Sequence, residues 1–160
     1  MTKFTHLDEK GRSKMVDVTV KEPTTREAVV RGKVLMNPDT VAIIDQGRMA
    51  KGDVFGVARI AGIMAAKKTS DIIPMCHPLE LTGIDIDFSS NAEKGEITIE
   101  ATVKTVGRTG VEMEAMTAVS AAALTIYDMC KSADREIILS DIKLITKRGG
   151  KSGTFIREEK

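Results

Sequence analysis

Several charged residues stand at the predicted ends of helices and strands, where they could act together on an anionic substrate. Lys51 precedes an apolar stretch of sequence, and Asp128 and Lys131 follow another. Lysine ammonium groups neutralise phosphates, and a carboxylate next to an apolar helix is expected to be partly desolvated, so that its protonation state can be tuned. The alternative is a surface ion pair between Asp128 and Lys131, with Lys67 only complementing a helix dipole. These residues alone leave both interpretations open.

One histidine lies in a loop that two prolines make rigid. His77 belongs to the Pro-Met-Cys-His-Pro segment at 74–78, an arrangement that suits an imidazole for recognition or proton transfer. A loop histidine that merely satisfies its own hydrogen bonds is the alternative. A zinc site with Cys76 and Cys130 is rejected, because the chain has no Cys-x-x-Cys pair and the adjacent Cys76 and His77 side chains diverge. Two cysteines cannot build a disulfide framework, which favours a reducing cytoplasm.

A glycine-rich basic segment, Gly-Gly-Lys-Ser-Gly at 149–153, lies near the end of the chain and follows Lys147. It is not a phosphate-binding P-loop, because Ile145 stands where that motif needs its first glycine and no helix is expected to follow. Its backbone amides and Lys151 could still wrap an anionic ligand. The segment is therefore a candidate anion-binding loop.

The composition excludes two classes of partner. The chain has 24 basic and 23 acidic residues, a net charge of +1, so it lacks the electrostatic attraction that nucleic-acid binding requires. The central predicted strands offer only Phe88 for stacking on bases. The longest uncharged stretch, residues 115–127, is too short to cross a bilayer. We expect neither nucleic acid nor a membrane as a partner.

Hydrophobic periodicity predicts the elements that must position these residues. Apolar residues alternate with polar ones in four stretches, and two longer stretches are helical in pattern. The predicted strands are 27–36, 84–88, 96–104 and 137–146, and the predicted long helices are 53–70 and 109–132. This order of strand, helix, strand, strand, helix, strand predicts an α+β ferredoxin-like sandwich, an antiparallel sheet with two long helices on one face.

Two helix starts carry predicted caps. Thr109 and Glu112 have the spacing of a capping box, in which the hydroxyl and the carboxylate each accept a backbone N–H. Asp39 or Thr40 is expected to cap a short helix that runs through Ile44.

The chain of 160 residues, 42% of them apolar, is expected to fold as a single domain over residues 1–160. Residues 1–25 are polar and predict an N-terminal arm, and residues 148–160 predict a flexible basic C-terminal segment.

Both predicted long helices lack the polar stripe of a helix that covers one sheet and faces water. We therefore expect a homo-oligomer in which another subunit covers the helices or the exposed sheet face. Gly56, Gly62 and the alanine run at 121–123 are expected to permit its close approach.

Seven sequence blocks together resemble the molybdenum cofactor biosynthesis protein C family over nearly the whole chain. The combination in this order is far more specific than any single block. The blocks are Met-Val-Asp-Val at 15–18, Lys-Gly-Asp-Val-Phe at 51–55, Ala-Arg-Ile-Ala-Gly at 58–62, Ile-Pro-Met-Cys-His-Pro at 73–78, Thr-Gly-Val-Glu-Met-Glu-Ala at 109–115, Ala-Leu-Thr-Ile-Tyr-Asp-Met-Cys-Lys at 123–131 and Gly-Gly-Lys-Ser-Gly at 149–153.

The resemblance implies a lyase of molybdenum cofactor biosynthesis that converts 3′,8-cyclo-7,8-dihydro-GTP to cyclic pyranopterin monophosphate and releases pyrophosphate. It also implies a ferredoxin-like homohexamer, a trimer of dimers with active sites at a subunit interface, and neither a metal nor a cofactor is expected. On matching positions it implies Lys51, Asp128 and Lys131 as the catalytic group, Met75, Cys76, His77, Met113 and Glu114 as substrate-binding residues, and Arg26, Lys67 and Lys147 as supporting anion contacts.

Glu112 keeps two interpretations, a substrate-binding residue and a helix cap. A noncatalytic nucleotide-binding regulatory module of ferredoxin-like topology is the alternative function, and it would need the cations without Asp128. A structural oligomeric scaffold, a third possibility, would tolerate loss of both Lys51 and His77.

Overall fold

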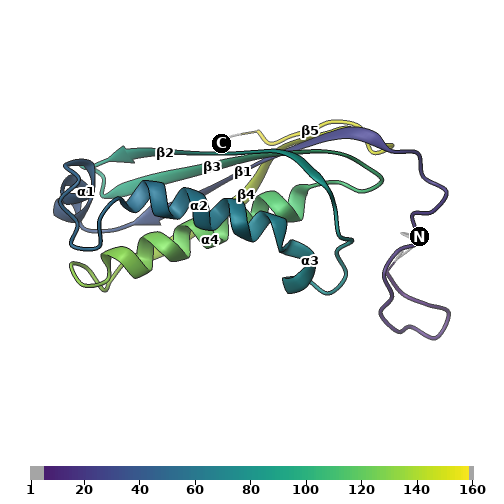
Figure 1. The fold of residues 1–160 in the computed structure, drawn as a ribbon, viewed down its shortest axis with the longest axis horizontal. Coiled ribbons are helices and arrows are strands. Elements are labelled where there is room, and N and C mark those ends of the chain that lie inside the picture. The colour runs from purple at the N-terminus through teal and green to yellow at the C-terminus, as the bar shows by residue number, and fades with distance from the viewer. Residues whose placement is uncertain (1–5, 159–160) are drawn as a thin grey trace.

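The structure, a computed structural model, describes residues 6–158, so Met1–Thr5 of the predicted arm and the last two residues of the predicted C-terminal segment lie outside it. Nine elements follow one another along residues 6–158 (Figure 1). They are β1 (Thr24–Leu35), α1 (Pro38–Asp45), α2 (Val54–Lys67), α3 (Thr69–Ile72), β2 (Leu81–Asn91), β3 (Glu96–Gly107), α4 (Glu112–Cys130), β4 (Ile138–Arg148) and β5 (Phe155–Ile156).

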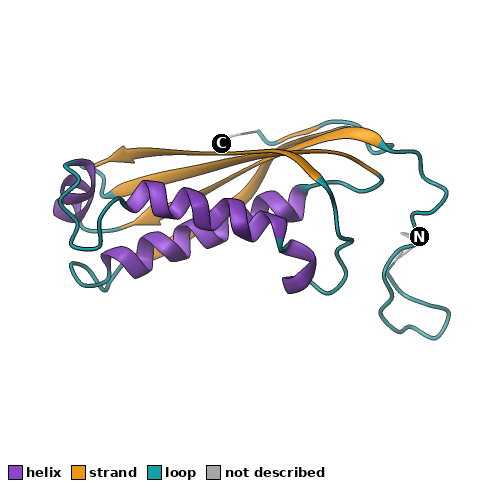
Figure 2. Cartoon of the chain, viewed as in Figure 1, coloured by secondary structure: helices purple, strands orange, loops and turns teal. Residues whose placement is uncertain are grey.

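The strands form one antiparallel sheet in the order β2-β3-β1-β4-β5. The two long helices, α2 and α4, lie side by side on one face of this sheet (Figure 2). The α+β class, the antiparallel sheet and the two helices on one face are therefore confirmed. None of the described helices has the length and apolar character needed to cross a membrane.

Strand alternation decides which side chains form the core. In β1, Ala28, Val30 and Val34 face the helices and are buried, as are Ile97 and Ile99 in the paired strand β3. The opposite face of the sheet carries ion pairs between neighbouring strands. These are Arg31 with Glu100 at 2.9 Å, Lys33 with Glu96 at 3.0 Å and Lys104 with Glu27 at 3.5 Å. The sheet thus has an apolar side against the helices and a polar outer side.

Small residues in the helices serve contacts inside the chain. A Cβ on Gly62 would lie 2.9 Å from the carbonyl oxygen of Ala118, so this glycine lets α2 approach α4. At Gly56 a Cβ would collide with the Asp53 carboxylate, which accepts the Gly56 N–H at 2.9 Å and caps α2. Gly62 thus serves a contact inside the chain, whereas Gly56 is half-exposed on the outer side of α2, where the predicted approach of another subunit stays a prediction.

The two helix caps that the sequence predicted are both wrong. Asn37 caps α1 by accepting the Asp39 N–H at 3.1 Å, one residue before a proline that suits the first helical turn. Helix α4 begins after Val111 with no side-chain cap, and the Glu112 carboxylate faces Lys147 of β4 instead. A tertiary ion pair thus replaces the capping box that local spacing predicted.

The C-terminal segment contains a short strand that the sequence pattern did not predict. In β5, Phe155 and Ile156 pair with Lys147 and Thr146 of β4. Arg157 extends this contact, since its Nε donates to the Leu144 carbonyl at 2.6 Å. This pairing brings the chain back beside β4 after the glycine-rich segment.

Candidate functional site

A cluster of three charged residues lies where α4 ends. The Lys51 ammonium, in the loop before α2, donates to the Asp128 carboxylate Oδ2 and to the Asp128 carbonyl oxygen, both at 2.9 Å. The Lys131 ammonium lies 2.7 Å from the other carboxylate oxygen, Oδ1. The tertiary fold therefore brings together residues 77 positions apart. We call Lys51, Asp128 and Lys131 the charged triad.

The charged triad is open to solvent, with 57% of the Asp128 side chain exposed in the single chain. The hydrogen bonds from Lys131 and Lys51 lower the pKa of Asp128 to about 2, and the same contact raises the pKa of Lys131. The prediction of a partly desolvated, tunable Asp128 is therefore wrong for the single chain. Asp128 is an ionised carboxylate that holds two ammonium groups side by side, and the triad carries a net positive charge.

A cavity of about 450 Å³ lies where α4 begins. Its wall combines the loop after α3, the start of α4 and the N-terminal arm. It is lined by residues that include the predicted Met75, Cys76, His77, Glu112, Met113 and Glu114, together with His6, Val16, Val18 and Lys21 of the arm. The structure thus brings together the residues predicted from two separate sequence blocks.

His77 fastens the arm to this cavity. Its Nε2 lies 2.7 Å from the Val16 carbonyl oxygen, and because a carbonyl can only accept, Nε2 carries the hydrogen. This contact fits the alternative in which a loop histidine satisfies its own hydrogen bond. Arg108 holds the arm farther along, by donating from Nε to the Lys21 carbonyl at 2.8 Å.

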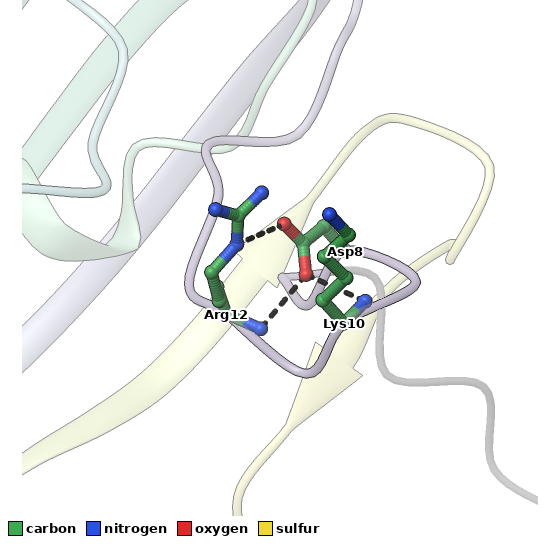
Figure 3. A network of polar contacts seen from close by, with 3 residues as sticks. All are labelled: Asp8, Lys10 and Arg12. Carbon is green, nitrogen blue, oxygen red and sulfur yellow. Dashed lines mark hydrogen bonds and ion pairs between the residues drawn. The ribbon is translucent and has the colours of Figure 1, made fainter.

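The outer part of the arm is a loop built around one carboxylate (Figure 3). Asp8 accepts the backbone N–H groups of Lys10 at 2.9 Å and Arg12 at 2.8 Å, and the Arg12 Nε at 2.8 Å. These hydrogen bonds lower the pKa of Asp8, those from Arg12 most. The loop is thus stabilised locally.

Glu114 is the buried carboxyl group of the first cavity, with 4% of its surface exposed. Desolvation raises its pKa, and the neighbouring Glu112 raises it further. Burial also raises the pKa of the Cys76 thiol, so this cysteine is not a ready thiolate nucleophile. The cavity therefore offers a carboxyl group that keeps its proton to a higher pH than an exposed glutamate does.

A second cavity, of about 500 Å³, lies between the arm, β1 and the glycine-rich segment. Arg26 lines it, and its guanidinium is fixed by donating to the carbonyl oxygens of Gly107 at 2.9 Å and Arg108 at 3.2 Å. Its other lining residues include two lysines and one carboxylate, Lys21, Lys151 and Glu22.

Lys147 connects the second cavity to α4. Its ammonium lies 3.2 Å from the Glu112 carboxylate and donates to the Ser152 hydroxyl at 2.7 Å. Glycine is required in the adjoining loop, since Gly149 and Gly150 have φ angles of 92° and 77°, and a Cβ on Gly150 would meet the Arg26 guanidinium. The predicted anion contacts Arg26 and Lys147 thus lie near one another.

The two groups of predicted site residues do not meet within one chain. Met113 and Asp128 lie fifteen residues apart on one straight helix, which separates them by about 22 Å at 1.5 Å per residue. Lys67 is exposed at the end of α2 and is not among the lining residues of either cavity. Within residues 6–158 no group of three His, Cys, Asp or Glu side chains could hold a metal ion.

The sequence interpretation missed several residues of this region. Lys21 lines both cavities, and Val16 and Val18 line the first. The Met-Val-Asp-Val block had marked this segment as distinctive, but nothing in its residue types indicated a cavity wall. Ser152, which accepts from Lys147, lies in the glycine-rich block that was singled out for its amides and lysine.

The sequence model of the MoaC family matches residues 15–150. A cyclic pyranopterin monophosphate synthase of Heliobacterium modesticaldum is 60% identical over 99% of this chain and 100% of its own length. Proteins of the same name are 58% identical in Pelotomaculum thermopropionicum, over 99% of this chain and 93% of the relative, and 57% identical in Roseiflexus sp. (strain RS-1), over 99% and 100%.

Proposed function

The chain belongs to the MoaC family, and from this premise we propose that it is a cyclic pyranopterin monophosphate synthase. It converts 3′,8-cyclo-7,8-dihydro-GTP to cyclic pyranopterin monophosphate and releases pyrophosphate. The observation that carries the proposal is the near full-length identity of 60% to a protein of that name, in a chain that also has the charged triad. The enzyme works in the cytoplasm.

We assign the chemistry of this reaction to the charged triad. Closure of a cyclic phosphate expels pyrophosphate, and the leaving group gains negative charge as its bond to the α-phosphorus breaks. Lys51 and Lys131 neutralise that charge, and the ionised Asp128 fixes their positions through contacts of 2.9 and 2.7 Å. A lysine released from Asp128 by bound substrate can also transfer a proton while the purine ring opens and the pterin ring closes.

The residues around the first cavity bind the purine-derived ring system. Met75 and Met113 supply polarisable apolar surface, and the Glu114 carboxyl group faces the same space. His77 holds the arm over the cavity through Val16. We assign binding of the phosphates to cations that supplement the charged triad, namely Arg26, Lys67 and Lys147.

We further propose that one active site combines residues of two chains in a ferredoxin-like homohexamer, a trimer of dimers. The distance of about 22 Å along α4 supports this, because one substrate molecule cannot touch both ends of that helix. The exposed apolar side chains on the outer side of α2 and α4 support it too.

The test is direct. Purified protein, incubated with 3′,8-cyclo-7,8-dihydro-GTP, should release pyrophosphate and form the cyclic phosphate product. If the protein binds this compound without any turnover, the noncatalytic nucleotide-binding regulatory module becomes the better description.

Mixing of chains tests the shared site. An Asp128→Asn chain and a Met113→Arg chain should each be inactive alone, and their co-assembly should restore activity, because some sites then receive both intact halves. If the mixture stays as inactive as its parents although the chains co-assemble, the site lies within one chain.

A further inference from the structure

The Lys147 ammonium is held from two sides. It lies 3.2 Å from the Glu112 carboxylate at the start of α4, and it donates to the Ser152 hydroxyl at 2.7 Å. Only 21% of the Lys147 side chain is exposed, so most of its flexible stem is ordered by packing. An ammonium group has three N–H donors, so these two partners do not exhaust its capacity to bind a ligand.

The two partners act differently on the charge of Lys147. The Glu112 carboxylate is an anion and offsets that charge, whereas the Ser152 hydroxyl is neutral and accepts a hydrogen bond without offsetting it. An anionic ligand therefore competes with Glu112 for the ammonium. Ser152, in contrast, fixes the position of the ammonium and leaves its attraction for anions intact.

The sheet places Arg26 beside Lys147. Lys147 of β4 pairs with Ala28 of β1, and Arg26 stands two residues before Ala28 in the same strand. Residues that pair across antiparallel strands share a face of the sheet, as do residues two apart in one strand. Arg26 and Lys147 are therefore neighbouring cations on one face, an arrangement that an anion between them stabilises.

The glycine-rich segment brings Ser152 to this pair of cations. The segment connects β4 to β5, and the pairing of these two strands closes its base. The Gly150 backbone packs so closely against the Arg26 guanidinium that a Cβ there would collide with it. The Gly153 N–H donates to the Gly150 carbonyl at 3.2 Å, so Ser152 lies within a hydrogen-bonded turn.

We propose that Ser152 is a positioning residue of the phosphate-binding site. By accepting from Lys147 it holds that ammonium beside Arg26, and the two cations bind the pyrophosphate group of the substrate. The inference rests on the proposed function, in which pyrophosphate is the leaving group, and it adds a residue that acts through Lys147. The second cavity, which Arg26, Gly150 and Ser152 line, provides the space for this group.

Removal and restoration of the hydroxyl test this role in the purified full-length protein. Inorganic pyrophosphate is the probe, and calorimetry measures its Kd. Ser152→Ala should raise this Kd and the KM of the substrate about fivefold each, with kcat nearly unchanged, because one hydrogen bond that orders the ammonium is lost. Ser152→Thr keeps the hydroxyl and should restore both constants to within about twofold of wild type.

Thr154→Ala is the matched control. It removes an exposed hydroxyl that lies just beyond the glycine-rich segment, two residues from Ser152. The Kd of pyrophosphate and the KM of the substrate should not change. Both positions are exposed, so the melting temperatures of all three variants should stay close to that of wild type.

A double-mutant cycle shows whether Ser152 acts through Lys147. In a Lys147→Ala background, Ser152→Ala should have no further effect on the Kd of pyrophosphate, because the ammonium that it positions is gone. An equal loss in both backgrounds would mean that the hydroxyl binds pyrophosphate by itself, and it would overturn the positioning role. Wild-type binding by Ser152→Ala, or no restoration by Ser152→Thr, would overturn it too.

Failure of this inference is distinguishable from failure of the proposed function, because pyrophosphate binding requires no turnover. A protein that shows the expected changes in Kd but never converts the substrate would refute the proposed function and support the role of Ser152. An active enzyme whose Kd for pyrophosphate does not respond to Ser152→Ala would refute the positioning role alone.

Discussion

The two ends of α4 carry carboxyl groups with opposite behaviour. At the C-terminal end, Asp128 is exposed and accepts from two ammonium groups, which lower its pKa to about 2. At the N-terminal end, Glu114 is buried, and desolvation raises its pKa. One helix thus presents a permanent anion that organises cations and a carboxyl group that can hold a proton. The neighbours that the fold provides, and not the residue type, decide which role a carboxyl group can take.

The largest effect is expected at the permanent anion. Asp128→Asn keeps the size of the side chain but removes the charge that holds Lys51 and Lys131, so turnover should fall about a hundredfold or more. Steady-state pyrophosphate release measures this, and the melting temperature should fall only slightly, because ion pairs between exposed side chains contribute little to stability. The exposed Asp87→Asn is the control and should keep full activity. Turnover close to wild type would reduce the triad to a surface ion pair.

The same anion makes a prediction about pH. A carboxyl group with a lowered pKa stabilises the folded chain at every pH above its unfolded pKa of 3.8. That contribution disappears as the pH falls toward the folded pKa of about 2. The NMR titration of the Asp128 side chain should therefore show no protonation between pH 7 and pH 4. A midpoint near 4 would mean that the two lysines do not hold it.

The buried carboxyl group should respond in the opposite direction. Because the pKa of Glu114 is raised in the folded chain, its contribution to stability is complete at a pH below its unfolded pKa of 4.5. That contribution is lost as the pH rises through its folded pKa. Glu114→Gln should therefore have a free energy of unfolding about 1 kcal/mol higher than wild type at pH 8, measured by urea titration. The reason is that an ionised carboxylate is costly to bury. The difference should vanish near pH 4.

Glu112→Gln is the matched control for this comparison. It stands two residues away but is partly exposed and paired with Lys147 at 3.2 Å. Removing the Glu112 charge should not increase the free energy of unfolding at pH 8. If both variants behave alike, burial does not distinguish the two glutamates.

A smaller effect is expected from the link between His77 and the arm. His77→Phe keeps an aromatic ring but removes the donor to Val16, a contact worth about 1 kcal/mol. KM should rise about fivefold with kcat nearly unchanged, because the arm closes the first cavity without entering the chemistry. A loss that falls mainly on kcat would instead place the imidazole in proton transfer.

The smallest effect is expected at the outer loop of the arm. Asp8→Ala removes three hydrogen bonds that are all local and exposed, so activity and melting temperature should not change measurably. Limited proteolysis should cut the arm faster, since the loop loses the acceptor that organises it (Figure 3). A clear loss of activity would mean that this loop, like His77, positions the cavity wall.

The sequence by itself determined the four long strands, the two long helices and the family. Period-two alternation located β1 to β4 because one face of each strand must be apolar, and the two long helices were visible because apolar runs of that length have few other uses. The seven blocks identified the family because their order and spacing depend on no coordinates. Residue types at matching positions then indicated which side chains could do chemistry.

Only the tertiary structure decided what surrounds each of these residues. Glu112 pairs with Lys147 instead of capping its helix. The space beside Gly62 is occupied by Ala118 of the same chain. Asp128 lies in solvent between two lysines. Local spacing cannot foresee such contacts, because each depends on which distant segment packs nearby. The separation of Met113 from Asp128 is of the same kind, since a sequence shows that two residues share a helix but not that a single chain leaves both ends of it incomplete.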